Sequence, residues 1–177
     1  MERLDPMKAE LIGLLCGEGS YYNSCSTYLQ YYPERKKTYI KRNKRTIYIQ
    51  FANHDTNLLK HFKNLVKIVY SYELSLNFDR IRICKRSIIE DLLKYSKYGY
   101  LNWDVPFEIL KGSEDLKIGF LRGFFDGEGT VSNTIRMFST NKEALKKVSL
   151  LLDQLNIKNT FNGPYCKENR KPYFMFI

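Results

Sequence analysis

The sequence predicts an α+β fold made of two pseudo-symmetric αββαββ repeats, the first of them extended by a further helix. Three observations support this fold class. A nine-residue motif, LIGLLCGEG at residues 11–19, recurs without a gap as LRGFFDGEG at residues 121–129. A second segment, DTNLLK at residues 55–60, matches NKEALK at residues 141–146. Each motif is followed by strand-like alternation and then by apolar residues at helical spacing.

The two copies define the expected organisation of the chain. We expect residues 1–98 to form the first repeat, residues 99–112 a linker that contains Trp103, and residues 113–177 the second repeat. The first repeat continues into a helix after its last strand, whereas the second ends at Ile177 before any counterpart of that helix. We therefore expect the second repeat to lack its last helix.

The elements of the first repeat follow from caps and periodicity. Asp5 and Pro6 predict a helix start, because an acidic N-cap followed by proline at the first helical position is favourable. The alternation of Ile47, Ile49 and Phe51 with polar residues predicts the second strand of a long hairpin. The expected elements are a helix over residues 7–17, hairpin strands over 21–32 and 46–51 joined by a basic loop at 35–45, a helix over 56–69, strands over 71–76 and 79–84, and a helix over 86–97.

The second repeat shows the same order in a shorter form. Ser113 predicts the cap of its first helix, and apolar residues such as Leu145, Val148 and Leu152 at helical spacing predict its second helix. The expected elements after the motif are a hairpin over residues 130–139, a helix over 142–155, and strands over 159–166 and 172–177. The first hairpin is the longer of the two, and its insertion contains the basic loop.

Composition and charge restrict the class of protein. Of 177 residues, 44% are hydrophobic, which is enough to bury a core and argues against disorder. Lysine and arginine number 29 against 19 acids, a formal charge of +10, and this excess favours a polyanionic partner. Four separated cysteines without a CxxC pair predict a reduced, intracellular setting and no zinc site. Only two histidines, His54 and His61, disfavour a histidine-rich metal site or an HNH-type nuclease.

The sequence also argues against a membrane protein. It has no apolar stretch long enough to span a bilayer, and its N-terminus has no signal-peptide pattern. We therefore expect an intracellular protein, in the cytoplasm or in an organelle if the host gene is organellar.

Glycine spacing brings the acids of the two motifs together. Glycines four residues apart occupy one helix face, so the two motif helices can pack closely while burying their flanking apolar side chains. The expected helix-interface residues are Gly13, Gly17, Gly123 and Gly127. In that packing Glu18 and Glu128 emerge side by side, and two adjacent carboxylates repel unless a cation lies between them. Oxygen-only ligands favour Mg²⁺ or a relative, and a metal beside a phosphodiester can activate water and stabilise the leaving oxygen.

On these residues the chain resembles the LAGLIDADG homing endonucleases, in their two-motif, single-chain form. The second copy, IGFLRGFFDGEGTV, matches the family motif closely, and the first departs from it with Cys16 where the motif usually has aspartate. The resemblance implies antiparallel sheets that form a DNA-binding saddle around central motif helices. It implies a site-specific endonuclease that hydrolyses both strands of a long, non-palindromic target across the minor groove and leaves 3′ overhangs.

The resemblance also assigns roles to residues at and near the motifs. It implies metal binding by Glu18 and Glu128 with the carbonyls of Gly17 and Gly127. The implied cofactor is Mg²⁺, with Mn²⁺ able to substitute and Ca²⁺ expected to bind without cleavage. By position, Lys85, Asn53 and His54 match polar and basic residues that support catalysis in the family, and Ser139 and Thr140 are the counterparts of the latter two.

Strand faces and the basic loop supply the expected DNA contacts. Along residues 79–84, Arg80 and Arg82 alternate with isoleucines, so one face of this strand is basic and the other apolar. The residues expected to contact DNA are Tyr48, Gln50, Arg80, Arg82, Arg136, Lys36, Lys37, Lys41, Arg42, Lys44 and Arg45. A solvated loop at 35–45 and a salt-bridged surface at Arg80 and Arg82 are the alternatives.

Competing functions share this fold. An intron RNA maturase, or a catalytically silent DNA-binding protein, is the main alternative to a nuclease. A PD-(D/E)xK nuclease fits poorly, because the two acids lie at helix ends. With both motifs in one chain, we expect a monomer that binds double-stranded DNA, with intron RNA as the partner under the maturase alternative.

Overall fold

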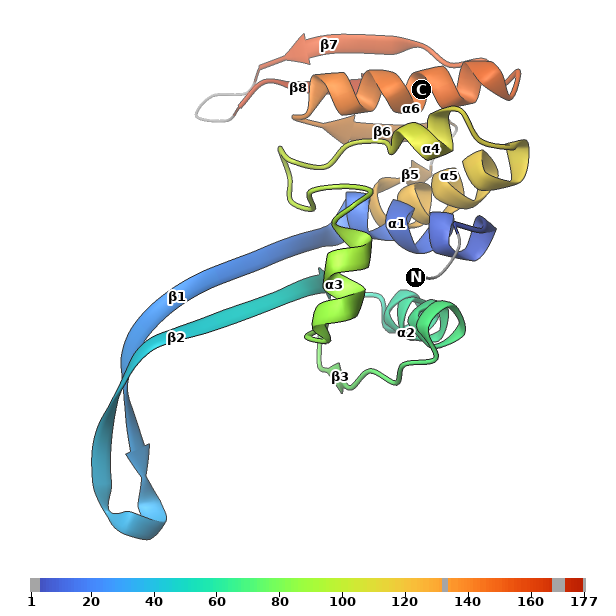
Figure 1. The fold of residues 1–177 in the computed structure, drawn as a ribbon. Helices are drawn as coiled ribbons and strands as arrows, with labels where there is room; N and C mark the ends of the chain where they lie inside the picture. The colour runs from blue at the N-terminus through green and yellow to red at the C-terminus, as the bar shows by residue number, and fades with distance from the viewer. Residues whose placement is uncertain (1–3, 132–133, 167–170, 177) are drawn as a thin grey trace.

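Two repeats of the same order lie on either side of a central helix pair (Figure 1). The computed structural model describes residues 4–131, 134–166 and 171–176. The first repeat comprises α1 (Pro6–Glu18), β1 (Gly19–Tyr32), the short 3₁₀ turn η1 (Pro33–Arg35), β2 (Lys37–Ala52), α2 (Thr56–Tyr70), β3 (Leu76–Asn77), β4 (Arg80–Ile83) and α3 (Arg86–Leu92). After α4 (Phe107–Leu110), the second repeat comprises α5 (Glu114–Glu128), β5 (Thr130–Val131), β6 (Ile135–Ser139), α6 (Lys142–Gln154), β7 (Phe161–Tyr165) and β8 (Tyr173–Phe176).

The two sheets confirm the predicted fold class. Each is antiparallel and four-stranded, with the order β1-β2-β4-β3 in the first and the equivalent order β5-β6-β8-β7 in the second. In the first sheet Gln50 pairs with Arg82, and the β1–β2 hairpin extends well beyond the body of the protein (Figure 1). The short β5–β6 pair gives the second sheet no such extension.

The central helices touch through their backbones. A Cβ atom at Gly13 would collide with the carbonyl oxygen of Phe120, and one at Gly123 would collide with the carbonyl oxygen of Glu10. The side chains around this contact, such as Leu11 and Leu14, are fully buried. The missing Cβ atoms therefore let α1 and α5 approach closely enough to bury both apolar faces.

The start of α1 is fixed by a cap and by a buried ion pair. Asp5 caps the helix by accepting a hydrogen bond from the backbone N–H of Lys8 at 2.8 Å. Lys8 is itself fully buried, and its Nζ lies 2.5 Å from Oδ2 of Asp91 in α3. Tyr70 donates a second hydrogen bond to the same oxygen at 2.9 Å. Burial raises the pKa of Asp91, but the hydrogen bonds from Lys8 and Tyr70 outweigh it and hold the pKa below its usual value.

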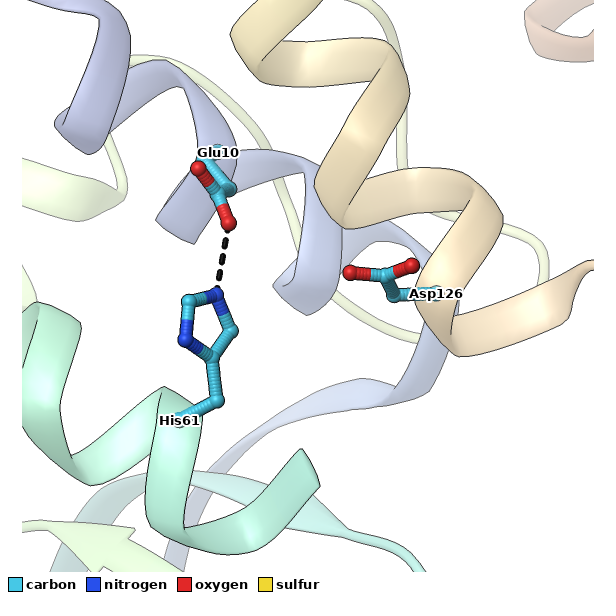
Figure 2. A group of neighbouring side chains, drawn as sticks. All are labelled: Glu10, His61 and Asp126. Atoms are coloured by element: carbon cyan, nitrogen blue, oxygen red, sulfur yellow. Dashed lines mark hydrogen bonds and ion pairs between the residues drawn. The ribbon is translucent and has the colours of Figure 1, made fainter. Parts of the chain in front are cut away.

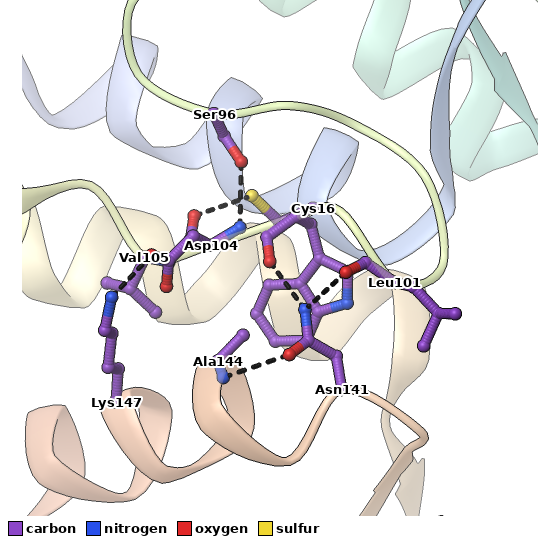
Figure 3. Close-up of polar contacts among 9 residues, drawn as sticks. Cys16, Ser96, Leu101, Asp104, Val105, Asn141, Ala144 and Lys147 are labelled. Atoms are coloured by element: carbon purple, nitrogen blue, oxygen red, sulfur yellow. Dashed lines mark hydrogen bonds and ion pairs between the residues drawn. The ribbon is translucent and has the colours of Figure 1, made fainter.

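Residues 99–112, the predicted linker, bury part of their side chains against both repeats. Trp103 is buried, with its ring centroid 4.7 Å from that of Phe124 in α5. Figure 3 shows how polar contacts anchor this segment: the Sγ of Cys16 lies 3.6 Å from the carbonyl oxygen of Asp104, and Asn141 donates to the carbonyl of Trp103 at 2.7 Å. The segment therefore joins α1 of the first repeat to α6 of the second.

The same contacts explain why the first motif carries cysteine where the second carries Asp126. Cys16 is buried beneath residues 99–112, and burial raises the pKa of its thiol to about 12. A carboxylate there would lose its hydration. Cys16 is thus a small core residue at the position where the second motif carries Asp126.

Three predicted boundaries are wrong. The basic run does not form a loop, because Lys37 already pairs with Tyr32 and β2 extends from there to Ala52. The strand expected over 71–76 is reduced to β3, because Ser71 ends α2 in the left-handed conformation and Leu74 is buried. The helix expected over 86–97 ends at Leu92, whose carbonyl accepts a hydrogen bond from the Tyr98 hydroxyl.

Among the described residues, no helix combines the length and the apolar character that crossing a bilayer requires.

Replacing Gly123 by alanine should force α1 and α5 apart. We expect Gly123→Ala to lower the free energy of unfolding by about 2–3 kcal/mol or more, because the added methyl meets the backbone of Glu10. Urea unfolding followed by circular dichroism measures the change. Ile118→Ala on the same helix, at a side chain 44% exposed, should change it by about 0.5 kcal/mol or less. An unchanged midpoint for Gly123→Ala would contradict the backbone contact.

Removing the charge of Asp91 should take away the carboxylate that the buried Lys8 contacts at 2.5 Å. We expect Asp91→Asn to cost about 3–5 kcal/mol at neutral pH. Because the folded-state pKa of Asp91 is lowered, its contribution is present above about pH 4 and is lost on acidification below that. Glu90→Gln, which removes an exposed pair with Arg86 on the same helix, is the control and should cost well under about 1 kcal/mol. Equal costs for the two variants would rule out a special role for the buried pair.

Candidate functional site

The two motif glutamates meet where α1 and α5 end. Glu18 and Glu128 are the last residues of these helices, and each is followed by a glycine that begins the next strand or leads into it. Each glutamate side chain lies over the glycine of the opposite helix. A Cβ atom at Gly17 would lie 3.2 Å from Cγ of Glu128, and one at Gly127 would lie 3.4 Å from Cγ of Glu18. The glycines thus make the space in which the two carboxylates come together.

The electrostatics of the pair favour a cation. Burial, and then the nearby charge of Glu18, raise the pKa of Glu128 to about 7. Burial also raises the pKa of Glu18, although less, because a hydrogen bond from Asn53 and the charge of His54 oppose it. None of the ion pairs among the described residues involves either glutamate. Two half-buried carboxylates, which make no ion pair within the part of the chain that the structure describes, fit an oxygen-preferring divalent ion.

The surroundings of the two glutamates differ. Asn53 donates a hydrogen bond to Oε1 of Glu18 at 3.3 Å, and a cavity of about 240 Å³ beside Glu18 is lined by Asn53, His54 and Asp79. Around Glu128 the cavity, about 290 Å³, has Ser139 and Thr140 on one side and aromatic rings on the rest. These rings belong to Tyr100, Trp103, Phe138 and Tyr173. Among the described residues, Glu18 therefore accepts a side-chain hydrogen bond, from Asn53, whereas the cavity of Glu128 is lined mainly by aromatic rings.

Lys85 is not brought into either of these cavities in the part of the chain that the structure describes. It is the N-cap of α3, and its Nζ lies 5.0 Å from the ring centroid of Tyr72. It lines a separate cavity together with Tyr70 and Asp91. The sequence does not identify Asp79, Trp103, Tyr100 and Tyr173 as residues that line the site. They lie outside the motifs and reach the site only through the fold.

One face of the first sheet gathers the predicted DNA-contacting side chains near the paired acids. Arg82 donates to Oε1 of Gln50 at 2.9 Å, and its guanidinium lies 4.6 Å from the ring centroid of Tyr48. Tyr48 stacks on Tyr22 with ring centroids 4.8 Å apart. The neighbouring Arg80 is held by Asp79 at 2.7 Å. On this face the guanidinium groups of Arg80 and Arg82 are thus held in place by neighbouring side chains.

The basic run divides between the two faces of the hairpin. A bulge at Asn43, with φ of 52°, shifts the register of β2. Beyond it Lys44 donates to the Tyr28 hydroxyl at 2.9 Å, and Lys41 lies over the ring of Tyr32. Lys37, Lys41 and Lys44 follow the alternation of the face that carries Gln50. Arg45 falls on the other face, where it bonds Asn23.

The remaining predicted contacts are scattered. Lys36 occupies the turn after η1 in the left-handed conformation, and Arg42 lies beside the bulge. Arg136 lies in β6 of the second sheet and donates to the hydroxyl of Thr134 at 3.0 Å. The first repeat thus carries all of the predicted DNA-contacting residues except Arg136.

Comparisons with known proteins agree with the fold and the motif. A family model described as a LAGLIDADG-like domain matches residues 115–175. The structure of the homing endonuclease I-DmoI in complex with DNA and Ca is similar, with a TM-score of 0.70 and 18% identity over 99% of this chain and 83% of that one. The N-terminal LAGLIDADG domain of DUF199/WhiA has a TM-score of 0.56 and 18% identity, over 99% of this chain and 75% of that one.

A relative in sequence is a DNA polymerase of Methanocaldococcus jannaschii, 30% identical over 97% of this chain. The chain spans only 10% of the length of that polymerase. The fold and the doubled motif together define an α+β protein with two LAGLIDADG motifs in one chain. Residues 115–175 match the LAGLIDADG-like domain, and the whole chain shares its fold with the homing endonuclease I-DmoI.

Proposed function

We propose that the protein is a site-specific endonuclease that cuts both strands of double-stranded DNA. The observation that carries this proposal is the meeting of Glu18 and Glu128 at the ends of packed helices, without a protein counter-ion among the described residues. The basic, aromatic face of the first sheet supports it, because that face continues directly from the end of α1. The formal charge of +10 favours the same polyanionic partner.

In this proposal the protein's own groups position the scissile phosphates. Glu18 and Glu128, with the carbonyls of Gly17 and Gly127, would hold Mg²⁺, which when bound supplies water activation and stabilisation of the leaving oxygen. Asn53 keeps Glu18 in place through its hydrogen bond, and His54 lines the same cavity beside it. We assign the polar support to Asn53 and His54 rather than to Lys85, which lines a different cavity.

The related structures support the choice of partner and ion. Structures of I-DmoI contain DNA with Mn or with Ca, and one variant was studied with DNA and Mg. We propose Mg²⁺ as the working ion of this protein, with Mn²⁺ as a substitute and Ca²⁺ as a non-productive ligand. Two motifs in one chain make a monomer sufficient, and the unequal hairpins suit a non-palindromic target. We further propose that the protein cuts across the minor groove, leaves 3′ overhangs and works inside the cell.

A DNA-binding protein without nuclease activity is the second candidate. The likeness to the LAGLIDADG domain of DUF199/WhiA favours it, because that protein shares the fold at a similar identity. An intron RNA maturase is a third possibility within the same fold. Retention of both glutamates in contact with the opposing glycines favours the nuclease.

Neutralising either glutamate should stop cleavage without preventing DNA binding. We expect Glu18→Gln and Glu128→Gln each to slow double-strand cleavage by about 1000-fold or more, because each removes a metal ligand. DNA affinity should stay the same or rise, since a negative charge is lost near the phosphates. Cleavage of host genomic fragments, mapped by sequencing the new ends with Mg²⁺ and with EDTA, gives the measurement.

The control for these variants is Glu114→Gln, at the opposite end of α5, which should cut like the parent protein. Full cleavage by Glu18→Gln or by Glu128→Gln would overturn the paired-acid site. Tight binding of intron RNA, with no DNA cut under any condition, would favour the maturase.

Arg82 should contribute directly to DNA recognition. Because Gln50 and Tyr48 hold its guanidinium on the sheet face, we expect Arg82→Ala to weaken DNA binding by about 5- to 150-fold. Arg86→Ala, at an exposed arginine paired with Glu90 in α3, is the matched control and should bind within about twofold of the parent. Fluorescence anisotropy at two salt concentrations measures both. Equal losses for the two variants would show that only net charge matters on this face.

A further inference from the structure

A second cluster of metal-ligating side chains lies apart from the paired glutamates. Glu10 in α1, His61 in α2 and Asp126 in α5 point toward one another across the gap between their helices (Figure 2). They line a cavity of about 540 Å³, and neither Glu18 nor Glu128 is among its lining residues. The cluster is therefore separate from the site proposed to cut DNA.

The geometry of the cluster is close to that of a bound ion's ligands. One ligand atom from each of the three residues lies within 4.8 Å of the other two. His61 Nε2 and Glu10 Oε1 are already 2.6 Å apart. The Glu10 side chain is 6% exposed, and Arg122 holds its other oxygen at 3.4 Å, so that Oε1 faces His61.

The local charge also suits a cation. Among the described residues, the cavity lining contains three acids, Glu10, Asp55 and Asp126, and one guanidinium, that of Arg122. A negative pocket in a chain of formal charge +10 stands out from the rest of the surface. Asp55 caps α2 and uses its oxygen for backbone N–H groups, which leaves Glu10 and Asp126 as the carboxylates available to an ion.

We propose that Glu10, His61 and Asp126 form a second divalent-metal site that takes an ion such as Zn²⁺ and clamps the two repeats together. An imidazole nitrogen with two carboxylates is a ligand set that Zn²⁺ accepts, with water in the fourth position, whereas Mg²⁺ prefers oxygen ligands only. Two ligands come from the first repeat and one from the second. Because such an ion binds only the folded chain, it stabilises the fold in proportion to its concentration.

This proposal differs from the expectation of no zinc site, which rested on the cysteine spacing. The three ligands come from separate elements, and no short motif connects them. The inference does not depend on nuclease activity, since its readouts are binding and stability.

The test titrates the full chain with ZnCl₂ in excess Mg²⁺, which keeps the oxygen-only site saturated. We expect calorimetry to show one Zn²⁺ per chain, and the Tm to rise by about 5–10 °C at zinc 100-fold above its Kd. His61→Gln and Asp126→Asn, at accessible side chains, should lose this rise and weaken binding at least about tenfold. His54→Gln, which removes the only other histidine, should retain both.

Three outcomes would overturn the proposal. One is the absence of saturable Zn²⁺ binding. Another is a loss of binding in His54→Gln with retention in His61→Gln, which would place the ion beside Glu18. The third is a thiolate absorption band in the Co²⁺-loaded protein, which would show that an exposed cysteine holds the metal. Cysteines that are exposed are Cys25, Cys84 and Cys166.

Discussion

The backbone contact between α1 and α5 at Gly13 and Gly123 is the constraint on which the rest of the structure depends. Because no Cβ atoms intervene, the two helices approach closely enough to bury their apolar faces and to align their C-terminal ends. Both glutamates, and the first strand of each sheet, start from those ends. Any side chain at this contact would therefore displace the acids and the sheets together.

The two halves share an architecture but not an environment. Glu18 is supported by Asn53, whereas Glu128 faces aromatic rings and has a pKa raised by burial to about 7. The first repeat also carries the long hairpin with its lysines and tyrosines. The second repeat is tied to the first through Trp103 and its neighbours, which pack against α5 and α6. Pseudo-symmetry thus sets the position of the acids, and the local sequence sets their chemistry.

Much of this arrangement could be predicted from the sequence, because its signals are local. The doubled motif predicts the packed helices, and strand alternation predicts which face carries Tyr48, Gln50 and Arg82. The packing of Trp103 and the grouping of Glu10 with His61 and Asp126 could not be predicted, since they join segments far apart in the chain. The prediction of a loop at residues 35–45 is wrong. In a strand whose two faces are both exposed to solvent, charged residues occur on both faces, so the sequence shows no alternation of apolar and polar residues.

The central claim is that Glu18 and Glu128 form one composite metal site. Anomalous scattering from crystals of the protein with its target DNA and Mn²⁺ tests it most directly, because it locates the ion without reference to activity. The account predicts anomalous density within bonding distance of the carboxylates of both glutamates and beside the scissile phosphates. Density away from both glutamates, in crystals whose DNA is cut, would contradict it.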